Sequence, residues 1–344
     1  MKEYFRRQAL LHPALQPQDA LKLAYQAAFG AEHLGADPLY ARSLLHSELM
    51  ACADVADQPL TEAIGPDTCR VNLAAWRRHF LPEGWLLEMF LRSCAPRADG
   101  PQRMENALAA LDALAGEGAL PFSRETWQQE KAAYLAGGLR PVHHSAAYRE
   151  QEAPAYRVVE ARYARMAPLL TRLRGRRPLV MALDGRCASG KTTLAQDMAD
   201  IVGAGVIHMD DFFLPAELRT PERLAAPGGN VHYERFREEV LPHLTQMAPF
   251  DYPRFDCGKM AINGTRTVPA APLYIVEGAY ACHPALGDYM SLRVFSDIDP
   301  EEQQRRILAR NGESGLATFN ARWIPLEEAY FQAYQVKEKA DVIV

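Results

Sequence analysis

Residues 185–192, GRCASGKT, combine glycine, lysine and threonine in the spacing G-x-x-x-x-G-K-[ST]. Glycine at both ends of such a loop permits backbone angles and close approaches that a Cβ atom would block. The N–H groups of the loop can then point inward, and the following helix adds the positive end of its dipole. Because these groups attract phosphate oxygens, the pattern predicts a nucleotide-binding loop.

The side chains of this loop suggest how a nucleotide triphosphate would be held. The Lys191 ammonium would approach the β- and γ-phosphates, and the Thr192 hydroxyl would take one place on Mg²⁺. We therefore expect ATP and Mg²⁺ as cofactors. The expected nucleotide-binding residues are Gly185, Ala188, Ser189, Gly190, Lys191, Thr192 and Thr193. The alternative is an ordinary glycine-rich turn between a strand and a helix, with a solvated lysine.

Two carboxylates, Asp210 and Asp211, follow the next apolar run of the sequence. In open α/β sheets, ligands bind at the carboxyl ends of the strands, which is also where the predicted phosphate loop lies. A carboxylate there can accept a proton from an attacking hydroxyl or hold Mg²⁺. The alternative reading is a pair of residues that cap a helix.

The elements that must position these residues are predicted over residues 178–344. Short, apolar, β-branched runs alternate there with helical segments, which predicts an α/β fold with a parallel sheet and helices on both faces. The runs cover residues 178–185, 205–211, 272–280 and 291–299, and residues 340–344 suit a last short strand.

The first part of the chain has a different pattern. Leu, Ala and aromatic residues recur at helical spacing, with Asp19 and Asp37 where N-caps are expected, and no alternating strands are evident. We predict an all-helical domain of unknown role over residues 1–150. A linker helix is predicted over 151–177, before the phosphate-binding domain at 178–344.

Several motifs in this order resemble a known family. GRCASGKTT, MDDFF, YPRFD and VEGAY, followed by an arginine-rich helix, are similar to the P-loop kinases of the uridine kinase, phosphoribulokinase, pantothenate kinase and glycerate kinase group. The resemblance covers about residues 178–344 and leaves out the first 150. It implies an ATP-dependent phosphotransferase with a small-molecule hydroxyl as acceptor. Nucleosides, sugars, sugar acids and pantothenate-like alcohols all remain open as that acceptor.

The resemblance assigns roles to the acidic residues. It implies that Asp210 is the catalytic base for the acceptor hydroxyl. Glu277, at the end of an apolar run and before a glycine, matches an acid that lies near Mg²⁺ or the acceptor. The expected metal site is therefore Thr192, Glu277 and Asp211. For Glu277 the alternative is a carboxylate that caps the next turn.

Arginines follow in the segment 299–312. Arg306 and Arg310 are four residues apart and would share one helix face. By resemblance, they belong to a lid that presents guanidinium groups to the transferring phosphoryl group, which suits their fixed charge and forked geometry. The alternative is a solvated face that pairs with Glu301 and Glu302.

The acceptor site is less sharply indicated. Residues 250–256, FDYPRFD, are similar to an acceptor-site element of the family, but Phe255 replaces its tyrosine. Arg254 and Asp256 are the remaining polar candidates, and a surface ion pair is the alternative for them. His232 lies where uridine kinases carry a ribose-binding run, although it could equally be an ordinary structural histidine. With Asp210 and Glu277, these residues form the expected substrate site.

Bulk properties restrict the partners. A net charge of −5 gives no reason to expect a nucleic-acid backbone or an anionic membrane as the main partner. No run of about 18 apolar residues occurs, so we expect no membrane span. The six scattered cysteines form no CxxC pair, which favours the cytoplasm.

Alternatives to a small-molecule kinase remain at this point. The chain could be a nucleotide-dependent ATPase or switch that acts through the N-terminal domain. It could also be a kinase for the 5′-hydroxyl of a nucleic acid, which would need a basic track that the acidic balance argues against. The N-terminal domain could bind a second ligand, form a wall of the acceptor pocket, or associate into a homodimer.

Overall fold

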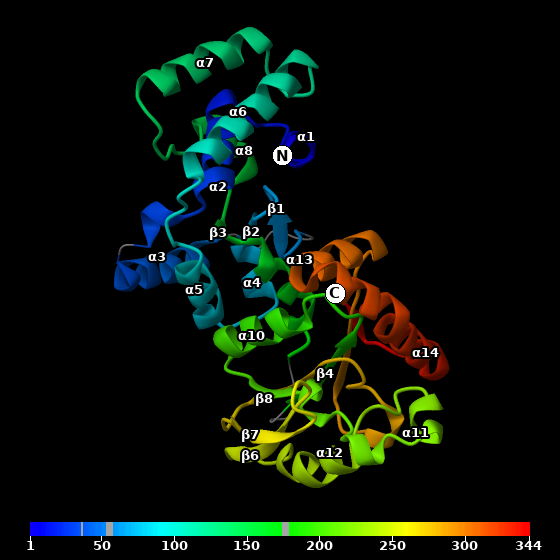
Figure 1. The fold of residues 1–344 in the computed structure, drawn as a ribbon. Coiled ribbons are helices and arrows are strands. Elements are labelled where there is room, and N and C mark those ends of the chain that lie inside the picture. The colour runs from blue at the N-terminus through cyan, green and yellow to red at the C-terminus, as the bar shows by residue number, and fades with distance from the viewer. Residues whose placement is uncertain (36, 53–57, 174–178) are drawn as a thin grey trace. The chain divides into compact units, whose positions relative to one another are not determined.

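The computed structural model divides the chain into two compact units, Met1–Thr171 and Arg172–Val344 (Figure 1). Each unit is built around its own sheet, and each is considered by itself below. The structure describes residues 1–35, 37–52, 58–173 and 179–344.

The first unit is mainly helical, as predicted. Asp37 caps α3 as expected, because its Oδ1 accepts hydrogen bonds from the N–H groups of Leu39 and Tyr40. Asp19 is instead the third residue of α2 and is buried. The helices are α1 (Lys2–Leu11), α2 (Pro17–Phe29), α3 (Pro38–Ala51), α4 (Leu73–Arg78), α5 (Glu83–Arg92), α6 (Gly100–Gly116), α7 (Arg124–Ala136), α8 (Ala146–Glu152) and α9 (Ala167–Leu170), with 3₁₀ turns η1 (Glu32–Leu34) and η2 (Ala161–Met166).

A small antiparallel sheet corrects the all-helical prediction. Its strands are β1 (Thr61–Ala63), β2 (Thr68–Asn72) and β3 (Tyr156–Glu160), in the order β1-β2-β3. The last of these lies within the predicted linker helix, so that prediction is wrong at β3, although η2 and α9 follow it as helical turns; 174–177 lie outside the described residues. Val158 and Val159 are both buried, and β-branched residues pack well in strands.

The second unit has the predicted parallel sheet, in the order β10-β9-β4-β8-β5. The central strand β4 is flanked by β8 and β9, so their carboxyl ends meet near its end. The strands are β4 (Leu179–Gly185), β5 (Gly205–His208), β8 (Leu273–Glu277), β9 (Leu292–Ser296) and β10 (Val342–Ile343). The α-helices are α10 (Lys191–Val202), α11 (Pro221–Ala225), α12 (Tyr233–Glu239), α13 (Pro300–Thr318) and α14 (Ile324–Tyr334).

An antiparallel hairpin stands apart from this sheet. It consists of β6 (Phe250–Asp256) and β7 (Ala261–Val268), with a register shift between Pro253 and Phe255. The sequence did not suggest β7. The remaining short elements are the 3₁₀ turns η3 (Met209–Phe212), η4 (Ala216–Leu218), η5 (Leu241–His243) and η6 (Pro284–Leu286), and the π-helical segment η7 (Phe319–Trp323).

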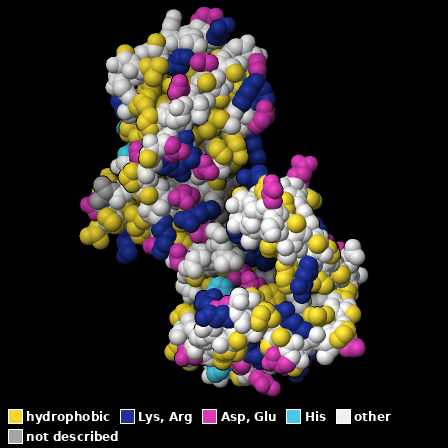
Figure 2. All heavy atoms as spheres, viewed as in Figure 1, with side chains coloured by type: hydrophobic (Ala, Val, Ile, Leu, Met, Phe, Trp, Pro, Cys, Tyr) yellow, Lys and Arg dark blue, Asp and Glu magenta, His cyan; other side chains and the backbone are white. Residues whose placement is uncertain are grey.

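Surface charge is mixed where it can be seen. On the face drawn in Figure 2, basic side chains are interspersed with acidic ones on both units. No helix among the described residues has both the length and the apolar character needed to cross a bilayer.

Candidate active site

The phosphate loop connects β4 to α10 and depends on its glycines. Gly185 has φ +133°, and a Cβ atom built there would lie 2.1 Å from the Ser296 carbonyl oxygen. Gly190, just before the helix, has φ +89°. Such angles are costly for residues with a side chain, so glycine is needed at both positions. The loop thus has the backbone form that its sequence predicts.

Replacing Gly185 by alanine should therefore destabilise the second unit by about 2 kcal/mol or more. The new Cβ would meet backbone atoms, which cannot move aside as a flexible side chain can. Urea unfolding measures the loss. Gly116→Ala is a suitable control because nothing lies within 4 Å of its added Cβ. Equal unfolding free energies for the two variants would contradict the expectation.

Lys191 and Ser189 give the loop its binding capacity. The Lys191 Nζ donates to the carbonyl oxygens of Gly185 (2.7 Å) and Arg186 (2.8 Å), which holds the ammonium inside the loop. The Ser189 hydroxyl is buried and has no hydrogen-bond partner among the described residues. Buried polar atoms are normally paired, and the first N–H groups of α10 have no acceptor within the helix. Phosphate oxygens fit these groups.

Glu327 of α14 already accepts one hydrogen bond from the loop. Its Oε2 lies 2.9 Å from the N–H of Cys187. The carboxylate is buried, and burial raises its pKa. The N–H of Cys187 is therefore oriented toward an oxygen acceptor, as a loop N–H must be to bind a phosphate. No sequence pattern indicated Glu327, because it lies far along the chain from the loop.

The pair of Thr192 and Glu277 offers oxygen ligands suited to Mg²⁺. The Thr192 hydroxyl donates to Glu277 Oε2 at 3.1 Å, with Oε1 at 3.3 Å. On its other side, Glu277 Oε1 lies 2.5 Å from His208 Nδ1. Mg²⁺ is usually bound by one or two such protein oxygens together with phosphates and water. The residues present therefore fit the predicted cation.

Asp210 lines the same cavity, immediately after β5. Its side chain is exposed to the solvent of the cavity. The protein around the carboxyl group still raises its pKa, first by desolvation and then through the negative charge of Glu277. A raised pKa makes a carboxylate a stronger proton acceptor.

Asp184, which was not among the predicted site residues, connects several segments of the site through hydrogen bonds. It is fully buried before the loop, and burial raises its pKa. Its Oδ1 accepts from the N–H groups of Gly185 (2.7 Å) and Tyr280 (3.2 Å). Its Oδ2 accepts from the Cys282 N–H (2.9 Å) and the Tyr330 hydroxyl (2.7 Å). One carboxylate thus joins the phosphate loop to the segment after β8 and to α14.

Asp211 does not line the cavity, contrary to the prediction that it binds metal. Its Oδ2 accepts from the Tyr252 hydroxyl (3.1 Å) and from Arg266 Nε (2.5 Å). Both partners belong to the β6–β7 hairpin, and Asp211 is buried against it. Its carboxylate anchors the hairpin, and we no longer include it among the metal ligands.

The predicted substrate residues Arg254, Asp256 and His232 also lie outside this cavity. Asp256 accepts hydrogen bonds from the N–H groups of Gly258 and Lys259, so it shapes the hairpin turn. Arg254 is 3.7 Å from Asp256 in a partly exposed ion pair. His232 caps α12 and lies near Glu234. The structure therefore supports the alternatives given for these residues: a surface ion pair for Arg254 and Asp256, and a structural histidine for His232.

The cavity has a volume of about 670 Å³, and both the phosphate loop and Asp210 line it. Arg306 and Arg310 of α13 face it, as does Arg322, and Arg306 Nη1 donates to the Ala188 carbonyl at 3.2 Å. The helix is broken at Gly312, where φ is +69°. Lining residues that the sequence did not identify are Phe213, Arg219, Asn230, Cys257, Met260, Tyr280, Phe319, Trp323 and Glu327.

About half of the chain is similar to proteins described as kinases. No protein-family model matches the chain. A uridine kinase from Chlamydia pneumoniae is 25% identical over 186 residues, which span 48% of this chain and 81% of that protein.

Two solved structures cover a similar share of the chain. A possible uridine kinase from Bacillus stearothermophilus has a TM-score of 0.42 and 19% identity, covering 53% of this chain and 96% of its own. A candidate fructose transport system kinase from Silicibacter sp. TM1040 has a TM-score of 0.42 and 22% identity, covering 54% and 98%. Together with the loop geometry, the similarity to a uridine kinase indicates a P-loop fold over about half of the chain.

Proposed function

We propose that residues 179–344 transfer the γ-phosphoryl group of Mg·ATP to a hydroxyl group of a small metabolite. One observation carries this proposal: Lys191, Thr192, Asp210, Glu277 and Arg306 line a single cavity of about 670 Å³. Groups for holding a triphosphate, for holding a cation and for accepting a proton therefore share one space. That volume lies within the range of small-molecule sites.

Bound Mg·ATP would supply the phosphoryl group, with the cation neutralising part of its charge. Lys191 and the loop N–H groups would hold the phosphates, and Thr192 with Glu277 would hold the cation. Asp210 would accept the proton of the acceptor hydroxyl as that oxygen attacks. Arg306 and Arg310 would stabilise the charge on the transferring group.

The acceptor would lie on the side of the cavity formed by Phe213, Arg219, Asn230 and Trp323. Asn230 provides an amide group on this side, next to Tyr280. The aromatic rings offer an apolar surface beside it. An acceptor with both a ring or carbon skeleton and several oxygens fits this side, which includes nucleosides, sugars, sugar acids and pantothenate-like alcohols.

A screen of hydroxyl metabolites tests this function. The full chain is incubated with Mg·ATP and each candidate, and ADP release is compared with the background without acceptor. At least one metabolite should raise the rate clearly above that background. Steady hydrolysis that no metabolite alters would contradict the proposal and favour an ATPase or switch. Salt-sensitive transfer to nucleic-acid 5′ ends would contradict it as well.

Arg306→Ala and Arg310→Ala should each lower kcat by about 100-fold or more, with a smaller effect on ATP affinity. The reason is that their guanidinium groups are placed to act on the charge of the transition state. Arg305→Ala is a matched control on the same helix, because Arg305 is exposed and pairs with Glu302. Steady-state kinetics with the acceptor from the screen would show the difference. Equal rates for all three variants would remove the arginines from the mechanism.

A further inference from the structure

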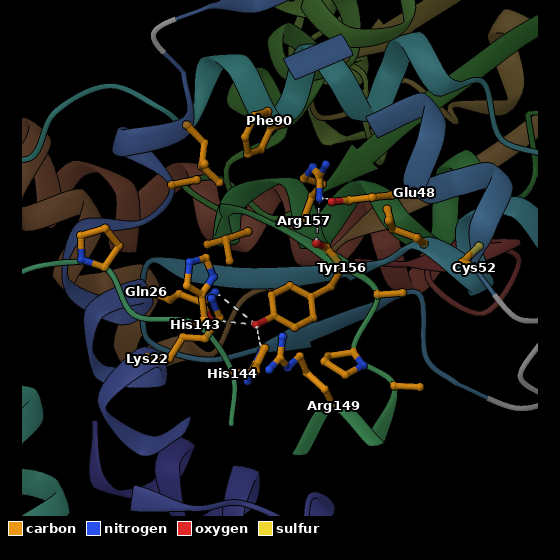
Figure 3. A pocket seen from close by; sticks show the side chains of 18 of the residues that line it. Lys22, Gln26, Glu48, Cys52, Phe90, His143, His144, Arg149, Tyr156 and Arg157 are labelled. Carbon is orange, nitrogen blue, oxygen red and sulfur yellow. Dashed lines mark hydrogen bonds and ion pairs between the residues drawn. The ribbon is translucent and has the colours of Figure 1, made fainter. Parts of the chain in front are cut away.

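A second cavity lies entirely within the first unit and has no part in the proposed kinase reaction. Its volume is about 690 Å³, and its walls come from segments far apart in sequence, including α2, α5 and the region 141–158 (Figure 3). One side is polar and the other apolar. The size is that of a small-molecule site.

The polar side is an ordered hydrogen-bond network around Tyr156. Figure 3 shows Gln26 and His144 directed at its hydroxyl. His144 Nε2 lies 2.6 Å from this hydroxyl, and Gln26 Nε2 donates to it at 3.2 Å. His144 Nδ1 lies 2.8 Å from Asp19 Oδ1. Asp19 thus favours the tautomer with a proton on Nδ1, so that Tyr156 donates to Nε2.

Arg70 also belongs to this network and packs against the Tyr156 ring. Its guanidinium carbon lies 4.3 Å from the ring centroid, and its Nη2 donates to Gln26 Oε1 at 2.9 Å. Arg70, Asp19 and His144 are all buried. A connected network of buried polar groups restricts the orientation of its members, so the Tyr156 side of the cavity is ordered.

The charges that line the cavity are mostly positive. Lys22, Arg149 and Arg157 carry positive charge, whereas Glu48 is the one carboxylate among the described lining residues and pairs with Arg157. The chain as a whole has a net charge of −5, so this excess is local. Figure 3 shows Arg157 and Glu48 together across the cavity from Lys22.

Two of these cationic side chains have hydrogen-bond donors without an acceptor among the described residues. Arg157 is only 7% exposed, and its Nη2 is buried without a hydrogen-bond partner among the described residues. The Arg149 side chain is exposed and forms no hydrogen bond or ion pair among them. An anionic ligand would supply an acceptor for this guanidinium group.

The ammonium form of Lys22 would also be stabilised by a negative charge in the cavity. Its Nζ donates to the Val142 carbonyl oxygen at 3.0 Å. Burial, and then the positive charge of Arg70, lowers its pKa to about 8. A negative charge in the cavity would relieve this repulsion and stabilise the ammonium form.

The apolar side is formed by Leu73, Phe90 and Val158, which are all buried, together with Leu34. We propose that this cavity binds a small organic anion, with its carboxylate or phosphate against Lys22 and Arg149 and its carbon skeleton against this apolar side. The proposal does not depend on the kinase reaction, since every residue it uses belongs to the first unit.

Calorimetry of the full chain with phenyl phosphate and phenylacetate as probes tests the proposal. At least one of the two should bind, and uncharged benzyl alcohol should bind more weakly. Arg149→Ala should lower the affinity by about tenfold or more, since hydrogen bonds to charged groups are strong. Arg149 has no partner that the variant would lose, so folding should be unaffected. Arg124→Ala, an exposed arginine of the same unit outside the cavity, is the control and should bind normally.

The variant Lys191→Ala separates this cavity from the phosphate loop, which could also hold phenyl phosphate. Probe binding should persist in that variant. Binding that is lost in Lys191→Ala and kept in Arg149→Ala would overturn the proposal, because the probe would then lie on the loop. Failure of both charged probes to bind wild-type protein would overturn it too. ATP binding, measured separately, reports on the kinase proposal alone.

Discussion

Lys191→Ala is expected to lower the affinity for Mg·ATP by about 100-fold or more. The ammonium is held in the loop by two carbonyl oxygens, 2.7 and 2.8 Å away, and is thereby placed to meet phosphate oxygens. Each hydrogen bond to a charged group contributes about 1.5–3 kcal/mol, and about 1.4 kcal/mol corresponds to a factor of ten in affinity. Calorimetry with Mg·ATP measures the change directly, and phosphoryl transfer should fall with it.

A matched control for this variant is Lys337→Ala in the same unit. Lys337 forms an ion pair with Asp297 and does not line the cavity. Its removal should leave ATP affinity within about twofold of wild type. Circular dichroism would establish that both variants fold. Wild-type ATP affinity in folded Lys191→Ala would contradict the assignment of the loop.

Asp210→Asn is expected to lower kcat by about 10²- to 10⁴-fold while ATP affinity stays nearly unchanged. Asparagine keeps the shape of the side chain but cannot accept the proton of the acceptor hydroxyl. Because Asp210 lies after β5 and outside the loop, the nucleotide contacts should persist. Steady-state kinetics and calorimetry on the same preparation separate the two effects. Asp251→Asn, an exposed aspartate of β6, is the control.

The pH profile gives an independent reading of this base. Burial and the charge of Glu277 raise the pKa of Asp210, and a base acts only when deprotonated. Activity of the wild-type chain should therefore fall as pH drops through a value above the ordinary range of aspartate, and Asp210→Asn should lose this limb. Wild-type transfer by Asp210→Asn would show that another group accepts the proton.

Features set by neighbouring residues could be predicted from the sequence. The phosphate loop is contiguous, so its glycines, lysine and threonine already imply its geometry. Asp210 and Glu277 could be expected to lie close together because Glu277 ends β8 and Asp210 follows the end of the parallel strand β5, and such ends share one edge of a sheet. Arg306 and Arg310 share a face through helical spacing alone.

Features set by distant partners could not be predicted in this way. Asp211 turns from the cavity because Tyr252 and Arg266, on a hairpin far along the chain, supply its hydrogen bonds. Glu327 and Asn230 reach the cavity only through the packing of the whole unit.

The sheet of the first unit was missed for the same reason. Strands β2 and β3 pair across a long stretch of intervening helices, and each has five residues or fewer. Segments this short carry little periodicity. The same long-range pairing places Tyr156 beside Gln26 and His144, so the second cavity was equally hidden from sequence.

The destination of the γ-phosphoryl group distinguishes a kinase from an ATPase. The full chain is incubated with γ-labelled Mg·ATP and a pool of hydroxyl metabolites, and the labelled products are separated. We expect label in a phosphate ester of one metabolite, and no such ester when Lys191→Ala replaces the wild-type chain. Label found only as free phosphate, at a rate that the pool does not change, would contradict it.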